Sequence, residues 1–138
     1  MRYRFDECLE RGKIVPIPVD PALSEKELRE AEADLAAAEQ SLAGHRTKWA
    51  IIQGYYALFH ALRSLVFARG YREKSHRCLK YAIEALLIDD GTLPAEVLGD
   101  FSFAMEVREG ADYGSTYSAE SAALVVASAR KVLGIIRE

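Results

Sequence analysis

Four polar side chains lie along one line of the most apolar stretch of this chain. They are Gln53, Tyr56, His60 and Arg63. Because they are spaced by three or four residues, a helix places them on one narrow stripe. A polar group buried without a hydrogen bond costs roughly 1–3 kcal/mol. The stripe therefore predicts either the wall of a nucleotide or RNA groove, or a polar seam that faces another helix or subunit.

A basic loop after this stretch could bind an anion. Ser75 is suited to be a helix N-cap, and the nearby cations are Arg72, Lys74 and Arg77. The N-terminus of a helix flanked by cations suits a phosphate group. His76 could donate to the same anion when protonated, or act as a general acid or base. An ordinary solvated basic surface is the alternative interpretation.

Arg108 is the only base among eight acidic residues in the segment 81–112. One interpretation is an ion pair with Asp112, which lies one helical turn later. The other is a cation that orients a phosphate while Tyr113 stacks on a base. The glycine-rich, zinc-binding and hydrolase motifs are absent from the sequence. We therefore expect no cofactor and no metal.

Charge is segregated along the chain, although the net charge is only −3. The segment 45–80 carries eight basic residues and one acidic residue, whereas its neighbours on both sides are acidic. Acidic and basic helices that face each other would explain this pattern, and so would a local anion or RNA site. The isoelectric point of about 5.7 argues against a protein that binds duplex DNA.

The two cysteines, Cys8 and Cys78, are not spaced like metal ligands. This argues against a zinc ribbon, a CxxC redox site and a disulfide scaffold, and it suits a reducing cytosol. Arg63 interrupts the longest apolar run, so no membrane span is expected. The first residues lack the apolar core of a signal peptide. We expect a cytoplasmic protein without a membrane partner.

Prolines and capping residues set the boundaries of the predicted elements. Residues 1–23 contain three of the four prolines and are expected to be an extended N-terminal segment outside the domain at 24–138. Ser24 and Glu27 form a capping box for a first helix, which ends at Gly44.

The remaining helices follow from apolar residues that recur every three or four positions. They are predicted at 47–69, at 75–89, at 94–109 and from Ser118 onward, with a polar loop at 110–118. No strand is expected after residue 20. The predicted fold class is all-α, an up-and-down bundle of four or five helices.

The helix predicted at 47–69 is apolar on nearly all sides, which is typical of a central helix. Its large aromatic residues cannot all face one small core, and so the sequence predicts a homodimer. These aromatic residues are Trp49, Tyr55, Phe59 and Phe67.

Three blocks of this sequence resemble the HEPN family, the higher eukaryote and prokaryote nucleotide-binding domains. The first block is Gly54-Tyr55-Tyr56-Ala57-Leu58-Phe59-His60-Ala61-Leu62-Arg63. The others are Gly70-Tyr71-Arg72-Glu73-Lys74-Ser75-His76 and Arg108-Glu109-Gly110-Ala111-Asp112-Tyr113. The resemblance implies a homodimeric helical bundle. Such proteins are often encoded beside a minimal nucleotidyltransferase, in a toxin–antitoxin-like pair.

Many HEPN proteins are metal-independent ribonucleases, in which an arginine is followed four to six residues later by a histidine. Arg108 matches that arginine, but Tyr113 stands five residues further on, where the histidine would be. An unperturbed tyrosine titrates near pH 10 and cannot replace an imidazole as acid and base at neutral pH. The resemblance thus implies a non-catalytic subunit that binds a nucleotide, RNA or a nucleotidyltransferase. In the last case, the nucleotidyltransferase would adenylylate Tyr113. The alternatives are a ribonuclease that uses Arg108 with a displaced histidine, His76 or His60, and a purely structural dimer.

For a binding subunit, we expect Gln53, His60, His76 and Arg108 to converge on one cleft. An always-charged guanidinium would hold a phosphate, and protonation of the histidines would strengthen binding below about pH 6.5. Arg108 and His76 on opposite faces of the molecule would contradict this hypothesis.

Overall fold

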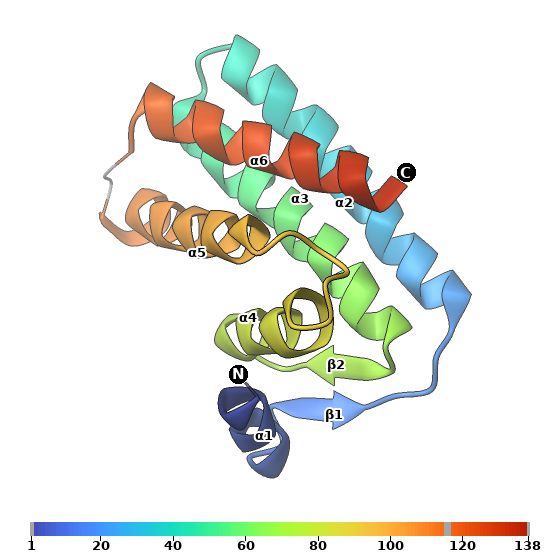
Figure 1. The fold of residues 1–138 in the computed structure, drawn as a ribbon. Coiled ribbons are helices and arrows are strands. Elements are labelled where there is room, and N and C mark those ends of the chain that lie inside the picture. Colours follow the sequence, from blue (N-terminus) through green and yellow to red (C-terminus); the bar gives the residue numbers. More distant parts are fainter. Residues whose placement is uncertain (1, 115–116, 138) are drawn as a thin grey trace.

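Helix α3, Thr47–Ala68, runs through the middle of the fold (Figure 1). The computed structural model describes residues 2–114 and 117–137. Most of α3 is buried, because other helices pack on several of its faces. The prediction of a central helix is therefore confirmed.

Two long helices flank α3. Helix α2, Pro21–Ala43, is connected to α3 by a short turn and lies along it. Helix α6, Ala119–Arg137, crosses both of them (Figure 1). The approach of α6 is close at Gly54, where an added Cβ would lie 3.0 Å from a methyl group of Val125. A glycine in the conspicuous block of α3 thus lets two helices pack tightly.

The remaining helices complete the bundle. Helix α4, His76–Ile83, continues into a π-helical turn, Glu84–Ile88, and α5, Glu96–Glu109, continues into another, Gly110–Gly114. Ser75 caps α4 as predicted, since its Oγ accepts the Cys78 N–H at 3.1 Å. The segment 110–118, which was expected to be a polar loop, begins with the helical turn Gly110–Gly114. Residues 115–116 of this segment lie outside the described residues.

The N-terminal segment is not simply extended, which corrects the prediction for residues 1–23. It forms helix α1, Tyr3–Glu10, and strand β1, Ile14–Pro16, which pairs antiparallel with β2, Tyr71–Glu73. Phe5 and Ile14 are fully buried in the main core. The prolines that suggested an extended chain constrain only its last part, and Phe5, Cys8 and Leu9 give α1 a helical apolar face. The presence of β2 also shows that the expectation of no strand after residue 20 is wrong. A strand of three residues is too short to show an alternating pattern in the sequence.

The capping box predicted at Ser24 is wrong as well. Helix α2 begins three residues earlier, at Pro21, where the fixed φ of proline suits a first helical position. The cap is Asp20, whose carboxylate accepts the Ala22 N–H at 3.0 Å. Glu27 therefore lies inside the helix and is buried against α3.

Cys8 and Cys78 form a disulfide that joins α1 to α4, with their Cα atoms 6.0 Å apart. This corrects the expectation drawn from their spacing. The two residues are 70 positions apart, and only the packing of α1 against α4 brings them within bonding range. None of the helices in the described part of the chain is long and apolar enough to cross a membrane.

The aromatic argument for a dimer holds for only one residue. Tyr55, Phe59 and Phe67 are all buried within this chain, whereas Trp49 is 52% exposed. One chain therefore provides enough core for three of the four aromatic side chains. The all-α bundle is confirmed, with one short two-stranded ribbon added, and the homodimer stays a prediction.

Candidate functional site

Arg108, in the last turn of α5, is held between two tyrosines of α3. Its Cζ lies 4.9 Å from the centre of the Tyr55 ring and 5.9 Å from that of Tyr56. Its Nη1 donates to the Tyr56 hydroxyl at 3.3 Å and lies 3.5 Å from an Asp112 carboxylate oxygen. The ion pair predicted for Asp112 is thus present, and the guanidinium is fixed over two aromatic faces.

His76 contacts the same two tyrosines from the first turn of α4. Its Nδ1 is hydrogen-bonded to the Tyr55 hydroxyl, and its ring lies 5.6 Å from the Tyr55 ring and 6.3 Å from the Tyr56 ring, centre to centre. The Phe59 ring is closer still, at 4.6 Å. We call Tyr55, Tyr56, His76, Arg108 and Asp112 the Arg108 cluster.

Burial and neighbouring charge control the protonation of this cluster. Burial lowers the pKa of His76, and the positive charges of Arg108 and Arg63 lower it further. Burial also raises the pKa of Tyr55, so its hydroxyl remains protonated at neutral pH. Where that hydroxyl donates to Nδ1, the neutral imidazole carries its proton on Nε2.

Arg108 retains a donor that the protein does not use. Its side chain is only 14% exposed, and its Nε is buried without a hydrogen-bond partner among the described residues. A buried unpaired donor is costly. A guanidinium binds phosphate and carboxylate groups through two parallel N–H bonds, which suits an anion that reaches this cluster.

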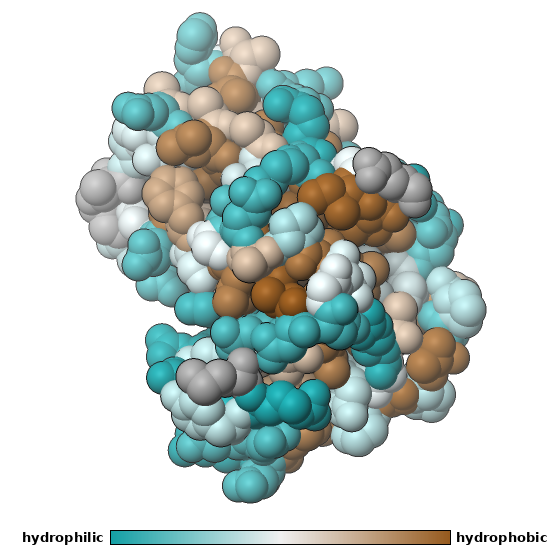
Figure 2. Space-filling model, in the orientation of Figure 1, coloured by the Kyte–Doolittle hydropathy of each residue, from teal (hydrophilic) through white to brown (hydrophobic). Residues whose placement is uncertain are grey.

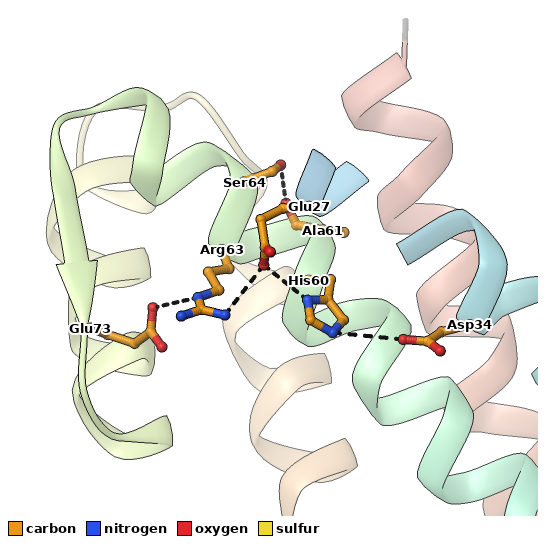
Figure 3. A network of polar contacts seen from close by, with 7 residues as sticks. All are labelled: Glu27, Asp34, His60, Ala61, Arg63, Ser64 and Glu73. Carbon is orange, nitrogen blue, oxygen red and sulfur yellow. Dashed lines mark hydrogen bonds and ion pairs between the residues drawn. The ribbon is translucent and has the colours of Figure 1, made fainter. Parts of the chain in front are cut away.

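The other polar residues of α3 belong to a different contact. Figure 3 shows Arg63 and His60 on either side of Glu27 from α2, with Glu73 of β2 beyond Arg63. The Glu27 carboxylate lies 2.9 Å from His60 Nδ1 and 3.5 Å from Arg63 Nη1, and Arg63 Nε donates to Glu73 at 3.0 Å. Asp34 of α2 lies 3.8 Å from His60 Nε2. We call this set the α2–α3 seam.

The two glutamates of the seam are shifted in opposite directions. Burial opposes ionisation of Glu27, but the hydrogen bond from His60 and the charge of Arg63 outweigh burial, so its pKa is lowered. Burial dominates at Glu73 and raises its pKa despite Arg63. Glu27 is therefore the stabilised anion of the seam.

Gln53 also faces α2, where its side-chain amide lies 2.6 Å from Ser41 Oγ. The predicted stripe on α3 is thus divided. Three of its members, Gln53, His60 and Arg63, form the interhelical seam that was one of the two interpretations, and Tyr56 alone joins the Arg108 cluster. The four residues expected to converge on one cleft do not, because Gln53 and His60 bind α2 while His76 and Arg108 share the two tyrosines.

The remaining sequence-predicted residues are exposed. The side chains of Lys74 and Arg77 are exposed, and Arg72 lies over the Phe67 ring at 5.6 Å. Tyr113, at 82% exposure, is the most exposed large apolar side chain among the described residues. No group of three or more metal-ligating side chains occurs in the described ranges.

Sequence reasoning missed Glu27 and Tyr55 as parts of these sites. Glu27 was assigned to a helix cap, although it lies four residues before the buried Ala31 and thus on the same helix face. Tyr55 was considered only as one of the aromatic residues that favour a dimer; its ring is buried in this chain, and its hydroxyl contacts His76. Only the position of α4 brings that histidine within reach.

Comparisons with known proteins agree with this architecture. Residues 24–138 match the family model of the HEPN domain. The fold is similar to that in the crystal structure of TT1696 from Thermus thermophilus, with a TM-score of 0.69 and 20% sequence identity. The alignment covers 83% of this chain and 95% of that one. No curated protein matches this sequence.

Proposed function

Because the chain belongs to the HEPN domain family, we propose that it is a binding subunit of a nucleotidyltransferase–HEPN pair and does not cut RNA itself. It would bind a nucleotide, RNA or the partner enzyme in a toxin–antitoxin-like system, in the cytoplasm. The observation that carries this proposal is the Arg108 cluster. It holds a fixed guanidinium whose buried Nε has no partner among the described residues, but Tyr113 occupies the position of the family's histidine.

Cleavage is the first property to test. We expect the purified protein to leave single-stranded RNA intact in EDTA, and Arg108→Ala to behave in the same way. EDTA inactivates contaminating nucleases that depend on a metal ion. It would not inactivate a ribonuclease of this family, because those enzymes need no metal. Cleavage by the wild type that disappears in Arg108→Ala would contradict a non-catalytic role.

The ribonuclease alternative has one observation in its favour, which is that His76 lies beside the tyrosines that hold Arg108. His60 is hydrogen-bonded to Glu27 of α2 and not to a tyrosine that holds Arg108. Should RNA be cleaved, this alternative predicts that His76→Ala abolishes cleavage. His60→Ala is the matched control and would retain activity in a folded protein.

The partner can be tested through Tyr113. Its exposed hydroxyl could attack the α-phosphate of ATP in a nucleotidyltransferase active site, which forms a phosphodiester to AMP and releases pyrophosphate. We expect co-expression with the flanking genes to add AMP at Tyr113, as detected by mass spectrometry. Tyr113→Phe should remove the added mass. Tyr117, also exposed, serves as an internal control, and an unmodified Tyr113 beside a co-expressed nucleotidyltransferase would contradict this part of the proposal.

We also propose that the chain is a homodimer with Trp49 in its interface. Trp49 is the only tryptophan of the sequence, so its fluorescence reports on that surface alone. We expect a dimer by light scattering at micromolar concentration, and an emission maximum that moves to longer wavelength upon dilution. A monomer of 15.4 kDa with constant emission would contradict the proposal.

A further inference from the structure

A cavity of about 360 Å³ is lined by residues of α1 and α4. These two helices lie at the end of the molecule opposite the α2–α3 turn (Figure 1). Basic side chains from α1, from the turn that follows it and from α4 line the cavity, with one acidic residue, Glu7, and the Cys8–Cys78 disulfide. The basic residues are Arg4, Arg11, Lys13 and Arg77. We call this the α1–α4 pocket. Figure 2 shows that this end of the molecule is largely hydrophilic.

The fold holds these cations in place from far apart in the sequence. Phe5 is fully buried and the disulfide joins α1 to α4, so Arg4 and Arg11 face the start of α4. The Lys74 N–H donates to the carbonyl of Lys13 at 2.7 Å where the two strands end. Arg77 follows in the first turn of α4.

The positive charge of the pocket is not compensated within the described part of the chain. Arg4 donates to the Tyr81 hydroxyl at 2.8 Å, which positions it without neutralising it. None of the three other cations forms an ion pair with a described acidic residue. By contrast, the exposed Arg130 and Arg137 are each paired with glutamates of α2. Four cations face the single carboxylate of Glu7.

We infer that the α1–α4 pocket binds a phosphate group carried by a nucleotide or by a single strand of RNA. Clustered cations repel one another, and a phosphate would relieve that repulsion while it accepts paired N–H bonds from arginine. The positive charge that would attract the phosphate comes from these side chains and not from the N-terminus of α4. At that N-terminus, the Cys78 N–H already donates to the Ser75 hydroxyl.

The pocket continues toward α5. Arg77 and Tyr81 also line an adjacent cavity of about 330 Å³, which reaches Glu109, the neighbour of Arg108 in sequence. Because Glu106 also lines that second cavity, its two carboxylates suit an uncharged part of a ligand, such as a sugar or a base, better than a second phosphate. Neither Arg108 nor His76 lines either cavity, so this site is separate from the Arg108 cluster. It also uses α1 and the turn that follows α1, which precede the residues matched by the family model.

The test is binding of a fluorescein-labelled single-stranded oligoribonucleotide, followed by anisotropy at low salt, with ATP and inorganic phosphate as competitors. The double variant Arg11→Glu/Arg77→Glu should bind at least about tenfold more weakly, equivalent to about 1.4 kcal/mol. The dependence of log K on log salt should also become shallower by about 0.7 per lost phosphate contact.

The double variant Arg130→Glu/Arg137→Glu makes the same change in charge away from the pocket and should stay within about twofold. Displacement by ATP but not by inorganic phosphate would identify a nucleotide site, displacement by both would identify a site for the phosphate group itself, and displacement by unlabelled RNA alone would identify an RNA strand; all three support the pocket. Equal losses in the two double variants, or no binding by the wild type to any probe, would overturn the inference. Retained binding in Arg108→Ala would show that this pocket acts independently of the proposed function at Arg108.

Discussion

Arg108 and His76 contact the same pair of tyrosines, Tyr55 and Tyr56, but differ in their charge at neutral pH. Arg108 is charged at every physiological pH, whereas His76 is kept neutral by burial and by that nearby charge. A neutral imidazole beside a fixed cation can accept a proton but does not add to the attraction for an anion. The pH dependence expected from the sequence, with stronger binding below about pH 6.5, therefore moves to lower pH at this cluster.

We predict that His76 titrates below about 6.5, the value of an unperturbed histidine. Arg108→Gln should raise the pKa of His76 but leave it below that value, since burial, the larger cause, remains. The measurement is an NMR titration of the imidazole carbons. Arg130→Gln removes an arginine that is paired with Glu39 instead, and it should leave the pKa unchanged. A pKa that does not respond to Arg108→Gln would contradict this electrostatic coupling.

Helices α2 and α3 are joined by charge as well as by apolar packing. Glu27 is 8% exposed and contacts both His60 and Arg63, so its loss would remove the carboxylate that these two residues of α3 share. Among the described residues the Glu73 carboxylate forms an ion pair with Arg63 alone, and burial disfavours its ionised form. The two glutamates of one seam thus contribute differently to stability.

We predict that Glu27→Gln lowers the free energy of unfolding by about 1–3 kcal/mol at pH 7, and that Glu73→Gln lowers it by less. The pKa of Glu27 is lowered in the folded state, so the ionised carboxylate stabilises the fold above its unfolded value near 4.5. That contribution is lost as the pH falls toward the folded pKa. Urea unfolding at pH 7 and pH 3.5 should therefore show a difference between wild type and Glu27→Gln that shrinks in acid. A constant difference would contradict the shift.

The approach of α6 to α3 can be tested with a pair of glycines. Gly99 lies in α5 with nothing within 4 Å of an added Cβ, whereas a Cβ at Gly54 would meet Val125 at 3.0 Å. We predict that Gly99→Ala stabilises the protein by about 0.5–1 kcal/mol through helix propensity alone. Gly54→Ala should give no such gain, because α6 must shift. Thermal unfolding of both variants measures this, and equal gains would contradict the close contact.

The disulfide links the N-terminal segment, which precedes the residues that match the family, to the helical bundle. It joins α1 to α4 across 70 residues, and it lies beside the pocket that we assign to phosphate. A cross-link over a loop of this length restricts the unfolded chain strongly. The N-terminal segment is therefore part of the same core as the HEPN bundle, as the burial of Phe5 and Ile14 also shows.

We predict that reduction of the disulfide lowers the free energy of unfolding by about 2–4 kcal/mol. Urea unfolding with and without dithiothreitol measures the difference. The double variant Cys8→Ala/Cys78→Ala is the control and should unfold at the same urea concentration in both conditions. A wild type that is equally insensitive would mean that the two thiols are unpaired.

Local patterns were sufficient to predict most helices. The recurrence of apolar residues every three or four positions, the glycines that end helices and the caps at Ser75 and Ser118 depend on neighbours within one or two turns. The same is true of the Arg108–Asp112 pair, which spans one turn of a helix. The sequence also determined that α3 is central, because a helix that is apolar on nearly all sides must be covered by neighbours on several faces.

Tertiary structure alone decided which polar groups meet. Glu27 and His60 are 33 residues apart, Arg108 and Tyr56 are 52 apart, and the two cysteines are 70 apart. No periodicity within a segment indicates which face of one helix will meet which face of another. The stripe on α3 was visible in the sequence, but its division between α2 and the Arg108 cluster follows from the directions in which α2, α4 and α5 pack around it. The α1–α4 pocket exists for the same reason, since its cations lie at both ends of a long stretch of chain that the core and the disulfide bring together.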